Sequence, residues 1–121
     1  MNRKNELNPL GKKVITGIEE LITYYESKES IIVTCPLCKA NRKKSEYFVN
    51  CELCPWIIFE DIRCEYWVLH EFGDFNSITR LQRNKPIWFT SIRILMLRRW
   101  WVTILYGKCP RIYLKAKSVN E

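Results

Sequence analysis

Histidine and glycine are scarce in this sequence of 121 residues. His70 is the only histidine, and there are four glycines. A histidine base needs a nucleophile and an orienting group beside it, and no such set is identifiable here. The sequence also lacks a glycine-rich phosphate loop and a cluster of histidines and carboxylates. We therefore predict a protein that is not an enzyme, with His70 an ordinary structural or surface residue.

The sequence also shows no pattern typical of a leader segment or of a membrane span, and we expect neither. The first ten residues contain three charged side chains and no apolar core of a signal peptide. A spanning helix needs about 20 mostly apolar residues. The most apolar run, 87–106, is interrupted by three arginines: Arg93, Arg98 and Arg99. We expect no membrane association and a cytoplasmic chain with reduced thiols. A secreted disulfide domain cut from a longer precursor is the alternative.

Four of the six cysteines form two Cys-x-x-Cys pairs, Cys35 with Cys38 and Cys51 with Cys54. This spacing brings four thiolates to one point and is typical of a structural zinc ion. Such a site is closed, because no coordination position is left for water or substrate. Two alternatives stay open, an iron–sulfur cluster, whose ligand sets overlap with those of zinc, and thiols that hold no metal.

The other two cysteines lie outside the pairs. Cys64 follows Cys54 by ten residues and could replace one of the four ligands, although a buried thiol near the metal is the favoured interpretation. Cys109 is predicted to be a free or buried thiol.

Helical periodicity predicts a helix near each end of the chain. Asn8-Pro9 is a typical helix start, and one apolar stripe follows it over residues 9–27: Val14, Ile18, Leu21, Ile22 and Tyr25. A longer helix is predicted over 86–106, ended by Gly107 and preceded by a short helix over 76–83.

A β-hairpin is predicted between these helices. Residues 30–34 and 46–50 are rich in β-branched and aromatic side chains and flank a polar, basic turn. With the cysteine pairs along it, the hairpin has the pattern of a zinc ribbon. The predicted fold is α+β, a single domain over 1–121. Its expected parts are an N-terminal helix at 9–27, a zinc-ribbon-like module at 30–64, a helical region at 76–106 and a basic tail at 107–121.

The long helix is apolar most of the way round. Trp88, Ile92, Leu95 and Val102 form one side, and a second side is formed by Ile94, Leu97, Trp101, Ile104 and Leu105. Such a helix is either packed on every side within its own molecule or covered by a partner. Arginine and tryptophan are enriched in interface hot spots. We therefore predict a protein-binding surface or a self-association surface, with five candidate residues: Arg93, Arg98, Arg99, Trp100 and Trp101.

The formal net charge of +7 favours polyanionic partners. Four basic residues decorate the predicted hairpin turn beside Tyr47 and Phe48: Lys39, Arg42, Lys43 and Lys44. Such a turn could bind phosphates while the aromatic rings stack on bases. A solvated turn without a ligand is the alternative interpretation.

The order of these motifs resembles small cysteine-rich accessory proteins encoded by bacteriophages and prophages. The resemblance covers roughly 31–105 and is carried by Cys35-Pro36-Leu37-Cys38, Cys51-Glu52-Leu53-Cys54-Pro55-Trp56, Cys64 and Leu97-Arg98-Arg99-Trp100. It implies a non-enzymatic protein of the bacterial host cytoplasm that binds and blocks a host defence complex, protein or nucleoprotein. A nucleic-acid-binding zinc-ribbon regulator and an iron–sulfur or redox protein are the alternatives. The basic tail after Gly107 departs from the pattern.

Overall fold

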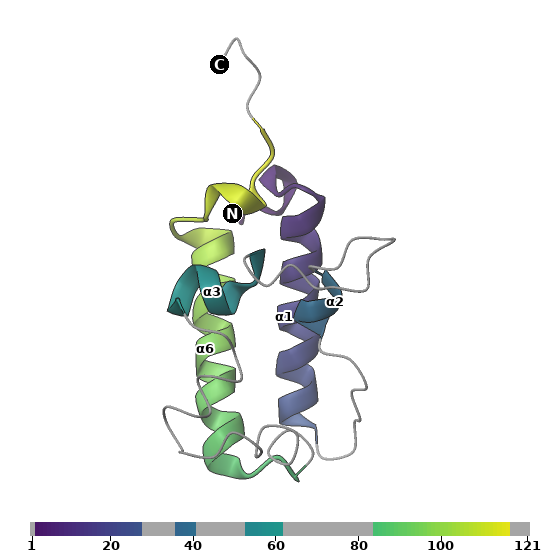
Figure 1. Cartoon of the computed structure of the whole chain (residues 1–121), viewed down its shortest axis with the longest axis vertical. Coiled ribbons are helices and arrows are strands. Elements are labelled where there is room, and N and C mark those ends of the chain that lie inside the picture. Colours follow the sequence, from purple (N-terminus) through teal and green to yellow (C-terminus); the bar gives the residue numbers. More distant parts are fainter. Residues whose placement is uncertain (1, 28–35, 41–52, 62–83, 117–121) are drawn as a thin grey trace.

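The computed structural model describes residues 2–27, 36–40, 53–61 and 84–116 (Figure 1). These residues form four α-helices and two short 3-10 helices, and they contain no strand. One isolated antiparallel bridge joins Leu7 to Leu114. In chain order the elements are η1 (Lys4–Glu6), α1 (Pro9–Glu26), α2 (Pro36–Ala40), α3 (Pro55–Glu60), α6 (Ile87–Tyr106) and η4 (Arg111–Tyr113).

The two long helices, α1 and α6, lie side by side and run in opposite directions (Figure 1). The Asn8 side chain caps α1 by accepting a hydrogen bond of 2.7 Å from the backbone N–H of Gly11. At its C-terminal end, α6 stops at Gly107, whose N–H donates to the carbonyls of Val102 and Thr103. Both helices agree with the predicted ranges of 9–27 and 86–106.

The core lies between α1 and α6. The predicted stripe of α1 is buried except for half-buried Ile22. It meets one side of α6, where Phe89, Trp100 and Ile104 are almost fully buried. The ring of Tyr25 on α1 packs edge-on against Phe89, with 6.0 Å between centroids. The apolar contacts supply the main stabilisation of this pair.

The α+β prediction, with its zinc-ribbon-like β-hairpin, is wrong, because the described part of the chain is helical. Pro36 and Pro55 each occupy the first position of a short helix inside the predicted ribbon module. Proline suits that position because its φ is preset and its missing N–H would be unpaired there. The two predicted strands, 30–34 and 46–50, lie outside the described residues, as does the predicted helix at 76–83.

A glycine on α1 permits the close approach of α2. A Cβ at Gly17 would lie 3.1 Å from the carbonyl oxygen of Pro36 and 3.3 Å from the Leu37 side chain. Leu37 is almost completely buried. The glycine that weakens α1 as an isolated helix therefore provides the contact surface for α2.

The described part of the predicted basic tail packs onto the core. Tyr113 in η4 is fully buried, and its hydroxyl donates a hydrogen bond of 2.8 Å to the carbonyl oxygen of Leu53. A Cβ at Gly11 would collide with the Tyr113 carbonyl oxygen. Residues 107–116 are thus part of the folded unit, since a buried aromatic ring anchors them.

Lys85 joins the start of α6 to the end of α1. Its ammonium donates hydrogen bonds of 2.9 and 2.7 Å to the carbonyl oxygens of Tyr24 and Ser27. It also lies 3.8 Å from the centre of the Tyr24 ring. A cation at this point is favoured by the partial negative charge of the helix C-terminus.

Candidate binding surfaces

The side of α6 that faces away from α1 is apolar and exposed. We name it the outer face and define it by five residues: Trp88, Ile92, Leu95, Val102 and Tyr106. They are spaced at intervals of three, four or seven along the helix, which places them on one line, and the exposed Arg99 lies on the same line between Leu95 and Val102. Leu95, near the centre, is 67% exposed. Ile87, at the start of the helix, is 82% exposed and extends the apolar surface.

Two of the five residues predicted to bind a partner are buried instead. Arg93 is 4% exposed, and its guanidinium donates a hydrogen bond of 2.8 Å to the Tyr25 hydroxyl. The same group lies about 5 Å from the ring centres of Trp56 (5.0 Å) and Phe89 (4.8 Å). Arg93 therefore joins α1, α3 and α6 through its hydrogen bond and its contacts with aromatic faces.

Trp100 is the second buried candidate, at 1% exposure. Its indole N–H donates a hydrogen bond of 2.9 Å to a carboxylate oxygen of Glu60 on α3. Its ring packs edge-on against Trp56, 5.1 Å between centroids, and is stacked with Phe59 at 6.1 Å. Trp100 thus holds α3 against α6 and is not available to a partner.

The other three predicted residues lie at the surface and contact carboxylates of neighbouring helices. Arg98 forms an ion pair of 2.6 Å with Glu26, and Arg99 forms one with Glu60. The Trp101 indole donates to Glu19 at 3.3 Å. The Arg98–Glu26 pair is exposed on both sides, and such pairs contribute about 0–1 kcal/mol, so Arg98 could exchange its carboxylate at little cost.

The predicted set thus overlooked the outer face itself. The five predicted binding residues were chosen because they are arginines and tryptophans. Three of them are buried or half-buried: Arg93, Trp100 and Trp101. Helical spacing was the informative signal, since it places four of the outer-face residues on one side of the helix. Tyr106 continues the same line.

The predicted metal ligands fall mainly outside the described residues. Cys35, Cys51 and Cys64 lie there, and for Cys38 only the backbone, within α2, is described. Cys54 is buried at the residue before α3. Within residues 2–27, 36–40, 53–61 and 84–116, no group of three or more metal-binding side chains is positioned to hold an ion.

Cys109 is a buried thiol, in keeping with the prediction. It donates a weak hydrogen bond of 3.4 Å to the carbonyl oxygen of Pro110. Burial raises the pKa of this thiol, although the nearby Arg3 side chain acts in the opposite direction. A thiol with a raised pKa is a poor nucleophile at neutral pH.

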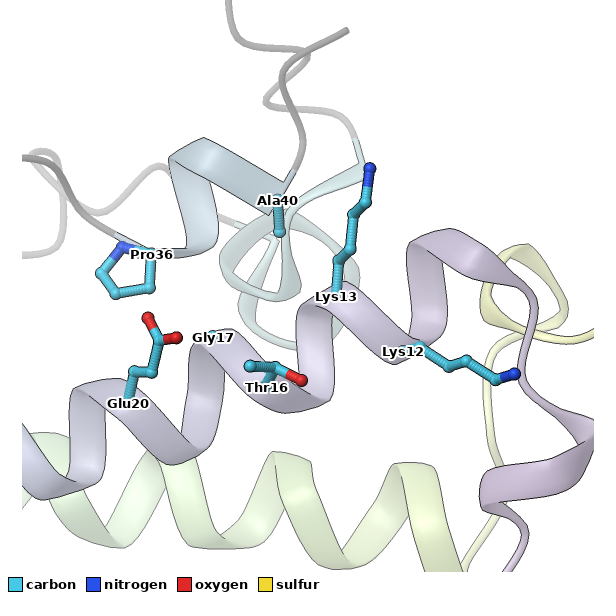
Figure 2. A pocket seen from close by; sticks show the side chains of 7 residues that line it. All are labelled: Lys12, Lys13, Thr16, Gly17, Glu20, Pro36 and Ala40. Atoms are coloured by element: carbon cyan, nitrogen blue, oxygen red, sulfur yellow. The ribbon is translucent and has the colours of Figure 1, made fainter. Parts of the chain in front are cut away.

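The basic turn predicted to bind nucleic acid falls outside the described residues, except for the backbone of Lys39. Arg42, Lys43 and Lys44 lie outside the described residues, and Lys39 is described only as backbone of α2. A hollow of about 370 Å³ lies beside this segment, between α1 and α2 (Figure 2). It is lined by Lys12, Lys13, Thr16, Gly17, Glu20, Pro36 and Ala40. The Lys13 side chain rises beside Ala40, and Glu20 points toward Pro36 (Figure 2).

In the described part of the chain, no helix is both long and apolar enough to cross a membrane. Comparison with protein-family models, with curated proteins and with solved structures gives no match for this chain.

Proposed function

We propose that this chain is a non-enzymatic binding protein that docks onto a larger host protein or nucleoprotein complex through the outer face of α6. The setting that the motif resemblance implies is a phage- or prophage-encoded inhibitor of a defence complex, acting in the cytoplasm of the bacterial host. The observation that carries the proposal is the exposed apolar line from Trp88 to Tyr106.

The outer face is costly to leave in water. Full burial of one large apolar side chain contributes about 1.5–3 kcal/mol, and five such side chains are exposed together here. Scattered apolar residues are common on protein surfaces, but a cluster of them on one face marks an interaction site. The outer face is apolar from Trp88 to Leu95 and continues beyond the exposed Arg99 with Val102 and Tyr106. The opposite side of α6 already supplies the core contacts, so the outer face is not needed to hold α6 against α1.

The shape and charge of this surface define the partner. A single helix with an apolar line fits an apolar groove, with anchors at helical spacing. Arg99 lies within the line, between Leu95 and Val102, and Arg98 lies beside it; both side chains are more than half exposed. The groove is therefore expected to carry carboxylates that would pair with these arginines when the helix docks.

The proposal includes one structural zinc ion held by Cys35, Cys38, Cys51 and Cys54. Helices of five and six residues, such as α2 and α3, are too short to be stable alone. Both belong to the segments that carry the cysteine pairs. A metal between them would supply stability that the short helices lack.

A quantitative capture experiment tests this function. The tagged chain is used to isolate the partner from its bacterial host, and the affinity of the purified partner is then measured. Leu95→Glu places a charge at the centre of the outer face and should weaken binding at least tenfold. Thr23→Glu, an exposed change on α1, is the matched control and should leave the affinity unchanged.

Two outcomes would overturn the proposal. Equal affinity of both variants would place the contact elsewhere on the chain. A stable dimer of the pure protein, converted to monomer by Leu95→Glu, would show that the outer face serves self-association. Thermal melting of each variant separates a lost contact from a lost fold.

A further inference from the structure

The fold brings two distant basic segments to one end of the molecule. The segment before α1 and the segment after α6 lie together, beside the start of α1 and the end of α6 (Figure 1). The Asn8 side-chain amide donates hydrogen bonds of 2.8 and 3.0 Å to the carbonyl oxygens of Ile112 and Leu114. The N–H of Lys115 donates to the carbonyl oxygen of Glu6 at 2.9 Å. These bonds fix the relative position of the two segments.

Most of the chain's positive charge excess is collected at this end. We define the basic end by six exposed side chains: Lys4, Lys12, Lys13, Lys108, Arg111 and Lys115. Arg3, which is half-buried beside Cys109, adds a seventh positive charge. Residues 2–13 and 107–116 contain one acid, the exposed Glu6. Neither ion pair of the described chain uses a basic-end residue.

The surface beside Lys12 is hollowed on two sides. The hollow of Figure 2 lies between Lys12, Lys13 and α2, and a second one of about 200 Å³ lies between Lys4, Lys12 and Leu7. Glu20 and Glu19, one in the lining of each hollow, are the carboxylates nearby. An extended polyanion could therefore lie over the basic end, with Lys12 between two recesses.

We propose that the basic end binds the phosphate backbone of a nucleic acid. A membrane surface would be expected to meet exposed apolar side chains among the cations. None of the large exposed hydrophobic residues of the described chain belongs to residues 2–13 or 107–116. A protein interface would likewise need apolar or aromatic anchors. The nearest such residue along the chain is Tyr106, which directly precedes residue 107. Cations drawn from several elements, with one exposed aromatic ring beside them and no apolar cluster among them, suit a chain of phosphates best.

This site differs from the basic turn predicted from the sequence, and it does not depend on the docking function of the outer face. Contacts with phosphates release counterions, so affinity falls steeply with salt. If all six exposed cations take part, the slope of log K against log salt is about −5 on duplex DNA, at roughly −0.9 per phosphate. Affinity should then fall roughly a thousandfold between about 50 and 200 mM salt.

The test measures the binding of the full chain to a short fluorescent duplex DNA of mixed sequence, and to a single strand of the same length, across a salt series. The triple variant Lys12→Gln, Lys13→Gln and Arg111→Gln should bind roughly tenfold or more weakly and flatten the slope by about 2 to 3. The matched control, Arg42→Gln, Lys43→Gln and Lys44→Gln, removes the same charge from the predicted basic turn. It should retain both affinity and slope.

Three other results of this experiment would overturn the proposal. Binding lost by the basic-turn variant alone would move the site to 42–44. The absence of salt-sensitive binding to either nucleic acid would exclude the site, and binding only to vesicles containing anionic lipid would identify a membrane surface instead. Leu95→Glu should bind DNA as the unmodified chain does, so this test is separable from that of the docking function. A thermal melt of each variant confirms that it is folded.

Discussion

The Tyr113 hydroxyl donates a hydrogen bond of 2.8 Å to the carbonyl oxygen of Leu53, sixty residues earlier in the chain. This contact joins the C-terminal segment to the residue pair that leads into α3. Burial, with smaller effects of the nearby Cys54 and Cys109, raises the pKa of Tyr113 far above its ordinary value of 10.0. The neutral hydroxyl is therefore the form that the fold requires.

Tyr113→Phe should change how stability depends on alkaline pH. A folded-state pKa above the unfolded one gives stability that is complete below pH 10.0 and is lost as pH rises beyond it. The unmodified chain should lose up to about 1.4 kcal/mol per pH unit more than the variant. Near neutral pH the variant should be less stable by about 1 kcal/mol, through the lost hydrogen bond. Urea unfolding from neutral to about pH 11 measures both, and parallel curves would contradict the assignment.

Two glycines of α1 should respond differently to alanine. At Gly11 the added methyl meets the backbone carbonyl of Tyr113, which cannot move without shifting η4, so Gly11→Ala should cost about 1–3 kcal/mol. At Gly17 the nearest atoms lie at 3.1–3.3 Å, and the gain in helix propensity of up to about 1 kcal/mol offsets the contact. Gly17→Ala should therefore be close to neutral. The reverse order in urea unfolding would contradict the packing described here.

Glu60 should matter more to stability than Glu26, although both accept an arginine. Glu60 also accepts the indole N–H of buried Trp100, so Glu60→Ala leaves that donor without its partner and should cost about 1–3 kcal/mol. In the described part of the chain, the contact of the Glu26 carboxylate is an exposed ion pair with Arg98. Glu26→Ala should therefore cost less than about 1 kcal/mol. Thermal unfolding of the two variants compares them, and equal losses would show that Trp100 does not depend on Glu60.

The proposed zinc site has its own test. Cys35→Ser and Cys51→Ser should each lower both the zinc content and the melting temperature, because the binding energy of a structural metal is folding energy. Cys109→Ser, outside the proposed ligand set, should change stability by less than about 1 kcal/mol. Elemental analysis and thermal melting of the same samples measure both effects. Full thermal stability of both ligand variants would contradict the zinc proposal, and visible absorption with iron would indicate a cluster instead.

Local signals in the sequence were enough to predict α1 and α6. Asn8-Pro9 and Gly107 mark helix ends by backbone chemistry, and the apolar spacing between these points is helical. Pro55 likewise starts a short helix, α3, from its first position. The α+β fold class rested on the β-rich stretches 30–34 and 46–50 together with the cysteine spacing, whereas Pro36 starts a helix that Leu37 anchors against α1.

Tertiary packing determined what local signals could not. The burial of Arg93 and Trp100 depends on Tyr25 and Glu60, which lie far away in the sequence. The folding back of the C-terminal segment depends on Asn8 and Gly11. Contacts of this kind leave no periodic pattern in the sequence. Arg93 and Trp100 were therefore predicted to be at the surface from their residue type alone. The outer face, by contrast, was already visible in the spacing of Trp88, Ile92 and Leu95.

The most direct test of the proposed docking function is a light-activated cross-linker placed at position 95 in cells of the proposed bacterial host. If the outer face of α6 contacts a partner, position 95 should give a discrete adduct with one host protein, and the same probe at position 23 of α1 should not. Loss of the adduct on adding Val102→Glu would confirm the contact along the helix. No adduct at position 95, or the same adducts at both positions, would contradict the account.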